Sequence, residues 1–113
     1  MSVIDTVLVA DTETGGFDPE AAPLLEVAAV WFPRPALGMY SYQSFVEFEG
    51  EIPPEARAVH HISPADVAPG APQCKPRAEV IERLLSFETD TSAWCFHNAT
   101  FDRGFLPELR RPV

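Results

Sequence analysis

The chain has 113 residues, a formal net charge of −9 and 46% apolar residues. This length fits one domain with a modest core, and the apolar fraction is ordinary for a globular protein. The negative charge argues against a protein that binds nucleic acid passively through a basic surface, because phosphate neutralisation requires Lys and Arg. It does not exclude a nuclease in which bound metal ions supply the positive charge.

Membrane insertion and export find no support in the sequence. No apolar run approaches the ~20 residues that a membrane-spanning helix requires. The first residues lack the basic region of a signal peptide. Cys74 and Cys95 form neither a C-x-x-C motif nor a disulfide framework. We therefore expect reduced thiols and a cytoplasmic protein without a membrane partner.

The first half of the chain predicts three strands. Residues 3–10 are rich in β-branched side chains and predict a buried strand. Residues 24–32 are apolar except for Glu26, which predicts a central strand covered on both faces. Residues 39–49 alternate between apolar and polar side chains, so we expect a half-exposed strand antiparallel to the preceding one.

A broken helical stretch follows these strands. Pro54 suits the first turn of a helix, which we expect to last about a turn and a half. Ser63 and Asp66 have the spacing of a capping box, so they predict that a second helix starts there.

The last part of the chain predicts a helix, a strand and another helix. Residues 76–87 carry the apolar stripe of an amphipathic helix. Residues 91–97 predict a short apolar strand, and a final helix begins near Thr100 and ends early at Pro107. This order predicts an α/β fold with helices packed on a mixed sheet, in a single domain over residues 1–113.

Two carboxylates stand at the end of the first predicted strand. Asp11 and Glu13 are two residues apart, so in a strand they share a face, about 7 Å from each other. Carboxylates this close repel each other, and a hard divalent cation such as Mg²⁺ would relieve the repulsion because it takes oxygen ligands. Taken alone, the spacing fits two exposed acids before a Gly15-Gly16 turn better than a metal site.

A third carboxylate follows the last predicted strand. Asp102 comes just past the carboxyl end of residues 91–97, where the functional sites of open α/β sheets gather. If this strand lies parallel beside the first, Asp102 reaches the same edge of the sheet as Asp11 and Glu13. Three converging carboxylates suit two divalent ions about 3.5–4 Å apart. The alternative is that Asp102 only interacts with the macrodipole of the final helix.

Together these segments resemble the first two motifs of the DEDD exonuclease superfamily. Asp11–Gly16 is similar to motif I, and His97–Asp102 is similar to motif II. Residues 52–63 are similar to the family's helix and "vHxIt" segment. Within the superfamily, His61 and the Phe101-Asp102-Arg103 segment look most like exonuclease X. The resemblance implies a ribonuclease H-like fold, which is a mixed sheet with flanking helices.

The resemblance also implies a function. The family's members are 3′–5′ exonucleases that release 5′-mononucleotides from the 3′ end of a nucleic acid, and we expect single-stranded DNA here. Asp11, Glu13 and Asp102 would be catalytic residues and three of the four metal-binding acids, which hold two Mg²⁺ or Mn²⁺ ions. A homodimer, or a polymerase or repair partner, stays open.

Five residues would contact the substrate: Thr12, Thr14, His61, Asn98 and Phe101. An aromatic side chain such as that of Phe101 could stack on a base. Helix capping for Asn98, core packing for Phe101 and hydrogen bonding for His61 are the alternative roles.

The family's third motif, a His or Tyr general base followed by a fourth metal-binding Asp, has no counterpart after Asp102. We therefore expect an incomplete, C-terminally truncated domain with motifs I and II. It should have little or no activity alone, because a general base contributes ~10²–10⁴-fold. A non-catalytic module for partner binding is the alternative. A haloacid-dehalogenase-type phosphatase fits poorly at Glu13 and Gly15, and an EF-hand loop from Asp11 would have Ala22 in place of its Glu.

Overall fold

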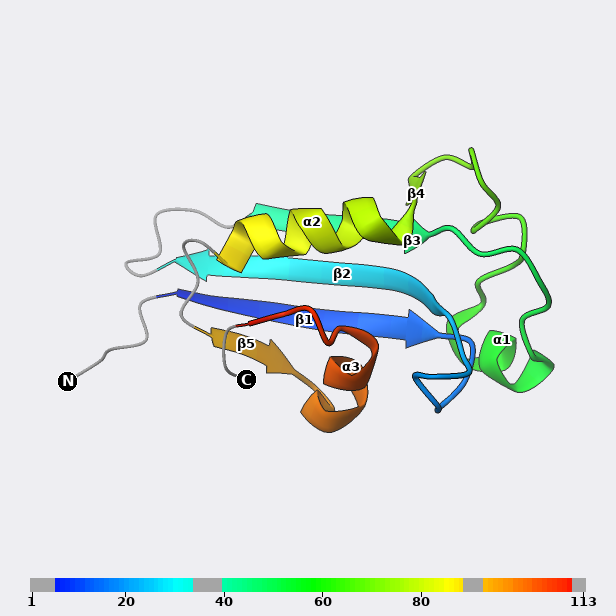
Figure 1. The fold of residues 1–113 in the computed structure, drawn as a ribbon, viewed down its shortest axis with the longest axis horizontal. Coiled ribbons are helices and arrows are strands. Elements are labelled where there is room, and N and C mark those ends of the chain that lie inside the picture. Colours follow the sequence, from blue (N-terminus) through cyan, green and yellow to red (C-terminus); the bar gives the residue numbers. More distant parts are fainter. Residues whose placement is uncertain (1–5, 34–39, 89–92, 111–113) are drawn as a thin grey trace.

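The computed structural model describes residues 6–33, 40–88 and 93–110. Its centre is a mixed sheet of five strands in the order β4-β3-β2-β1-β5, with the helices arranged around it (Figure 1). The predicted α/β fold is therefore confirmed. None of the helices in the described ranges is long and apolar enough to cross a membrane.

The predicted antiparallel pairing of residues 39–49 with the preceding strand is confirmed, although the strand ends at Val46. β1 (Thr6–Thr14) pairs antiparallel with β2 (Leu24–Pro33) and parallel with β5 (Ala93–Phe96). β2 pairs antiparallel with β3 (Tyr40–Val46), which pairs parallel with the two-residue β4 (Cys74–Lys75). β4 was not predicted, because two residues carry no periodic pattern. The predicted strand residues 3–5, 39 and 91–92 lie outside the described ranges.

Three helices complete the fold. α1 (Pro54–His60) starts at the predicted proline, and α2 (Arg77–Glu88) matches the predicted amphipathic helix within one residue. α3 (Ala99–Phe105) ends before Pro107, as predicted. The helix expected at Ser63 does not form. Its capping-box hydrogen bonds are present, with the Ser63 N–H donating to Asp66 Oδ2 at 2.8 Å, but they close only a turn.

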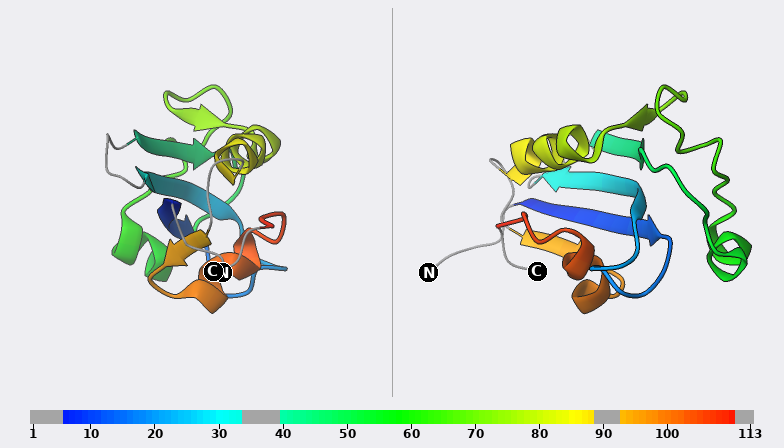
Figure 2. Two further views of the ribbon diagram at one scale, coloured as in Figure 1. Left: turned by 90° about the vertical axis from the view of Figure 1, so that its left-hand side faces the viewer. Right: turned by 45° about the vertical axis from the view of Figure 1, so that its right-hand side comes forward.

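Helices α2 and α3 lie on the same side of the sheet (Figure 2). Every second residue of β1 and β2 therefore enters one core: Leu8 and Ala10 meet Val27 and, from α2, Leu84. The opposite face is more open, because Val9 is 41% exposed and Ala28 is exposed. The prediction that residues 24–32 are covered on both faces is thus wrong. Apolar residues fill both faces of this strand, but helices α2 and α3 cover only one.

An irregularity in the pairing of β1 and β2 lies beside the two motif I acids. Glu13 pairs with Glu26 and Thr14 pairs with Leu24, so Leu25 is left over as the extra residue of a β-bulge. The Leu25 side chain is fully buried in a second, smaller core with Ile52, Ile62 and Val67. Ala56 of α1 packs against this small core.

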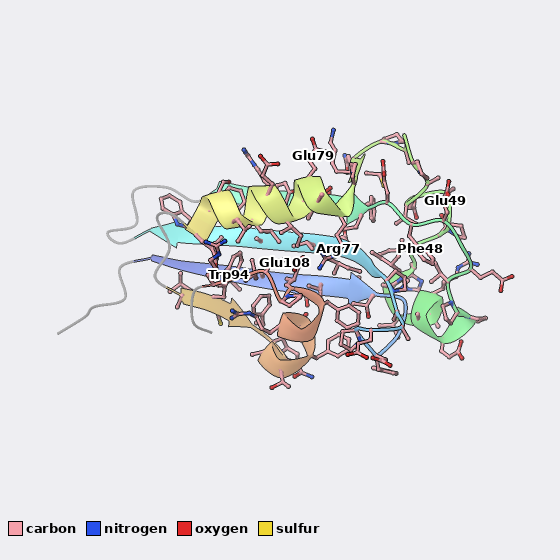
Figure 3. The ribbon with its side chains drawn as sticks, in the orientation of Figure 1. Phe48, Glu49, Arg77, Glu79, Trp94 and Glu108 are labelled. Atoms are coloured by element: carbon pink, nitrogen blue, oxygen red, sulfur yellow. The ribbon has the colours of Figure 1, made fainter. Side chains whose placement is uncertain are left out.

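After α3 the chain runs back along α2 and is held there by charged residues. Arg77, at the start of α2, forms an ion pair with Glu108 and donates to the Phe105 carbonyl oxygen at 2.9 Å (Figure 3). Glu88, at the end of α2, accepts from Trp94 Nε1 at 2.6 Å and from the Arg110 N–H at 2.9 Å. We call this set of contacts the tail clamp.

Candidate functional site

The alternation of β1 separates its acids from its threonines. Asp11 is exposed and Glu13 is half-buried, and both point away from the main core. Thr12 and Thr14 point to the opposite, helix-covered side and are buried. Asp11 and Glu13 lie in one strand and therefore share a face, as predicted.

Glu13 stands in a crowded electrostatic environment. Burial raises the pKa of its carboxyl above the usual value, and the carboxylates of Asp11, Glu26 and Asp102 raise it further. Like charges at short range destabilise one another unless a positive charge lies between them. The oxygen atoms at this end of β1 thus form a place where a cation would lower the energy.

Asp102 reaches the same edge of the sheet from α3. β5 runs parallel beside β1, with Ala10 paired to Phe96, and α3 begins three residues after the end of β5. The Asp102 side chain is only 3% exposed. It accepts a hydrogen bond from the hydroxyl of Thr12, the strand residue that lies between the two other acids.

These donors fit a divalent cation in chemistry but form an incomplete set. Carboxylate oxygens are the ligands that Mg²⁺ and Mn²⁺ prefer. Within the described ranges, however, no three His, Cys, Asp or Glu side chains stand close enough together to hold a metal ion. The sequence predicted that Asp11, Glu13 and Asp102 converge on one site, but in the described part of the structure they share an edge of the sheet without forming a group that could hold a metal ion.

A cavity of about 360 Å³ adjoins the carboxylates. We call it the β1 pocket, and its volume lies in the usual range of small-molecule sites. It is lined by residues of β1, the following loop, α1 and α3, among them Glu13, Thr14, Phe17, Val59, His60 and Phe101. One acid of motif I therefore borders the same space as an aromatic ring of motif II.

The mouth of the β1 pocket carries exposed apolar side chains. Phe17 is 91% exposed and Val59 is 77% exposed. The Phe17 ring meets the Phe101 ring edge to face at a centroid distance of 6.2 Å. Exposed aromatic groups at a pocket mouth offer flat surfaces for a ligand to stack on. The sequence had singled out Phe101, and neither Phe17 nor Val59.

The loop that carries Phe17 is held close to β2. The Gly15 N–H donates to the Pro23 carbonyl oxygen at 2.9 Å. A Cβ atom at Gly15 would come within 2.8 Å of Pro23 Cδ, closer than the packing permits. The glycine of motif I is therefore required by the close approach of two chain segments.

Of the two adjacent histidines, His60 borders the β1 pocket, whereas His61 lies elsewhere. His61 ends α1 in the left-handed conformation, with φ = 59°, and its side chain is exposed beside Arg57. His60 Nδ1 accepts from the Ile62 N–H at 2.9 Å, and its buried Nε2 has no partner of regular hydrogen-bond geometry in the described ranges. Burial lowers the pKa of His60, which favours the neutral ring.

The remaining predicted contacts divide between the pocket and the surface. Thr12, Thr14 and Phe101 line the β1 pocket, although the Thr14 hydroxyl donates to the Gly16 carbonyl oxygen at 2.7 Å. Asn98 precedes α3 as its N-cap residue, is exposed, makes no side-chain cap and does not line the pocket.

Comparison with known proteins identifies the family. The exonuclease family model (RNase_T) matches residues 8–109, which include both acidic segments. The chain belongs to the exonuclease family. Its place in the DEDD superfamily, predicted from the two motifs, is therefore confirmed, while the closer similarity to exonuclease X stays a prediction. No match emerges among curated protein sequences.

Solved structures of another exonuclease have the same fold. E. coli exonuclease I in complex with a dA16 oligonucleotide superposes with a TM-score of 0.76 at 20% identity, covering 90% of this chain and 23% of that one. A zinc-bound form of its complex with single-stranded DNA gives 0.76 at 20% identity, covering 92% and 23%. Apo exonuclease I gives 0.75 at 19% identity, covering 92% and 24%. The exonuclease domain described here thus spans about a quarter of those chains, and its ribonuclease H-like fold is confirmed.

Proposed function

We propose that this exonuclease domain binds the 3′ end of single-stranded DNA and forms part of a metal-dependent 3′–5′ exonuclease that releases 5′-mononucleotides. One observation supports this most strongly. The β1 pocket joins Glu13, a carboxylate in a crowded acidic environment, to the aromatic ring of Phe101 and to His60. A terminal nucleotide presents a base, which suits the aromatic rings, and a phosphate, which would suit a cation held by the carboxylates.

The carboxylates would act on the phosphate side. Asp11, Glu13 and Asp102 would hold two Mg²⁺ or Mn²⁺ ions, which activate a water molecule and stabilise the leaving 3′-oxygen in this type of reaction. The formal net charge of −9 makes such ions the natural source of positive charge toward a phosphate. In exonuclease I, a zinc ion accompanies bound single-stranded DNA.

The aromatic side of the pocket would hold the base. Phe17 and Phe101 present their rings at the mouth, where stacking on a base contributes about 1–3 kcal/mol and tolerates any sequence. Because His60 Nδ1 accepts from the Ile62 N–H, the neutral ring carries its proton on the buried Nε2, which can only donate and lies near the Thr14 backbone. Thr14 would contribute its backbone, since its hydroxyl is engaged with Gly16.

We further propose that these 113 residues alone cleave DNA slowly or not at all. No His, Tyr or Asp follows Asp102 in the sequence, so no general base or fourth acid of the predicted kind is available there. A homodimer, a polymerase or repair partner, and a cytoplasmic location stay predictions. If metal binding and 3′-end binding both fail, the domain is better described as a non-catalytic binding module.

Binding of a labelled oligonucleotide tests the proposal. Fluorescence anisotropy of a 5′-fluorescein single-stranded DNA should rise with the 113-residue chain in Mn²⁺ and not in EDTA. An unlabelled linear strand should compete, and a circular single strand of the same sequence should not. Equal competition by the circle, or binding that ignores Mn²⁺, would contradict recognition of a 3′ end.

The same labelled strand tests activity. On a denaturing gel we expect at most trace shortening by the 113-residue chain after prolonged incubation with Mn²⁺. Robust removal of 3′ nucleotides that disappears in the Asp11→Ala variant would show that these residues already contain a complete catalytic set.

A further inference from the structure

We propose that Thr12 is a positioning residue, whose hydroxyl holds the Asp102 carboxylate at the acidic edge of the sheet. This inference rests on the proposed function and assigns Thr12 a role other than the substrate contact predicted from its place in motif I. The hydrogen bond joins two segments that are 90 residues apart in the sequence. It directly links motif I to motif II.

The position of Thr12 in the strand first suggests a partner for its hydroxyl. Leu8 and Ala10 precede it on the same face of β1 and enter the main core. Thr12 continues this buried row at 6% exposure. A valine would fill such a position equally well in a strand, because it has the same branched shape. The hydroxyl is thus a polar group in an apolar row, and such groups are found buried when they have a hydrogen-bond partner.

The buried Asp102 carboxylate requires a hydrogen-bond donor. Its carboxylate is 3% exposed, and an ionised carboxylate only accepts hydrogen bonds. Its own N–H donates to the Asn98 carbonyl oxygen at 3.0 Å, as part of the first turn of α3. Within the described ranges, the Thr12 hydroxyl is the one donor that its carboxylate has. Charge-assisted hydrogen bonds of this kind fix the orientation of the acceptor.

The link fixes one oxygen atom of the buried Asp102 carboxylate. Thr12 binds Oδ1, and Asp102 stands near enough to act electrostatically on Glu13. If Asp102 joins a cation held by Asp11 and Glu13, the Thr12 hydroxyl would limit the orientations that its carboxylate can take there. Loss of hydrogen bonds that orient metal ligands typically lowers metal affinity by about 10–100-fold.

Calorimetric titration of Mn²⁺ into variants of the 113-residue chain tests the role of Thr12. Thr12→Val keeps the shape and loses the hydroxyl, so we expect affinity to fall by about 10–100-fold. Thr12→Ser keeps the hydroxyl and should stay within a few-fold of the unmodified chain. In an Asp102→Ala background, Thr12→Val should have no further effect, because Thr12 acts through Asp102.

A matched control separates this role from general packing. Ser44→Ala also removes a buried hydroxyl from the sheet, but that hydroxyl donates to the Phe45 carbonyl oxygen at 2.8 Å, so Mn²⁺ affinity should not change. Circular dichroism checks folding, and if Thr12→Val does not fold, Thr12→Ala against Thr12→Ser repeats the comparison.

Three outcomes would overturn the inference in distinguishable ways. Unchanged affinity in Thr12→Val refutes the positioning role and leaves the proposed function standing. A loss of the same size in the Asp102→Ala background shows that Thr12 does not act through Asp102. Absence of Mn²⁺ binding in the unmodified chain removes the proposed function, and this inference with it.

Discussion

The tail clamp and the β1 pocket lie on the same small domain, but polar groups have favourable partners in the clamp and lack them in the pocket. In the tail clamp, Arg77 and Glu88 each have at least two partners, and the contacts join α2 to the last described residues. In the β1 pocket, Glu13 is surrounded by like charges, and His60 keeps a buried nitrogen without a regular partner. Phe17 is almost fully exposed at its mouth.

This contrast separates stability from function. Satisfied buried polar groups stabilise one packing of the chain, whereas repelling charges and exposed rings cost stability unless a ligand completes them. The tail clamp therefore stabilises the fold and offsets the cost of the repelling carboxylates and exposed rings of the β1 pocket. The comparison predicts that changes in the clamp affect unfolding, and that changes in the pocket affect binding.

The largest effect on stability should come from Glu88. Glu88→Ala leaves the buried Trp94 indole N–H and the Arg110 N–H without their charged acceptor. At about 1.5–3 kcal/mol for each hydrogen bond to a charged group, we expect the free energy of unfolding to fall by about 4 kcal/mol. Urea denaturation measures it, with Glu82→Ala at an exposed position of the same helix as the control. Equal effects of the two variants would contradict a special role for the clamp.

The next effect concerns cation binding and should leave folding intact. Asp11→Asn removes an exposed carboxylate that we propose as a ligand, and with it part of the repulsion on Glu13. Mn²⁺ affinity should fall by about 100-fold or more, while the free energy of unfolding stays within about 0.5 kcal/mol or rises. Calorimetry and urea denaturation measure the two quantities. A variant that unfolds readily but binds Mn²⁺ normally would reverse the assignment of roles.

A smaller effect is expected at the pocket mouth. Phe17→Ala should weaken binding of single-stranded DNA by about 10-fold, because one stacking surface is lost, and leave unfolding unchanged since the ring is 91% exposed. Val9→Ala, an exposed apolar residue that does not line the pocket, is the control. If anisotropy gives the same affinity for both variants, Phe17 does not contact the DNA.

The smallest effect belongs to the exposed part of the clamp. The hydrogen bond from Arg77 lowers the pKa of Glu108 below its usual value. The resulting stabilisation is therefore full above the unfolded pKa of 4.5 and is lost as the pH falls below it. Glu108→Gln should cost less than about 1 kcal/mol at neutral pH, because the pair is partly exposed. Urea denaturation at neutral and strongly acidic pH should show the difference between the two proteins vanish in acid.

Much of the fold follows from patterns that the sequence displays. The β-branched run before Asp11, the apolar stripe of α2 and the position of Pro107 predicted their elements correctly. Because β1 and β5 pair in parallel, Asp102 lies at the predicted edge of the sheet. These predictions succeed because periodicity and proline geometry act locally.

Features that depend on how the elements pack together could not be predicted from the sequence. Residues 24–32 are apolar on both faces, and only the placement of α2 and α3 decides which face is covered. His60 and His61 are adjacent and identical in type, so their roles depend on where α1 ends. Phe17 follows a glycine pair in a loop without a sequence pattern, and only its ring contact with Phe101 in the folded chain identifies it as part of the pocket.

The central claim is that the acids at the end of β1 hold a divalent cation. Anomalous diffraction from crystals of the 113-residue chain soaked in Mn²⁺ tests it directly. We predict a Mn²⁺ peak bonded to carboxylate oxygens of Asp11 and Glu13, with Asp102 oriented toward it. A fully soaked crystal with no peak at these residues, or with its peaks elsewhere on the acidic surface, would contradict the claim.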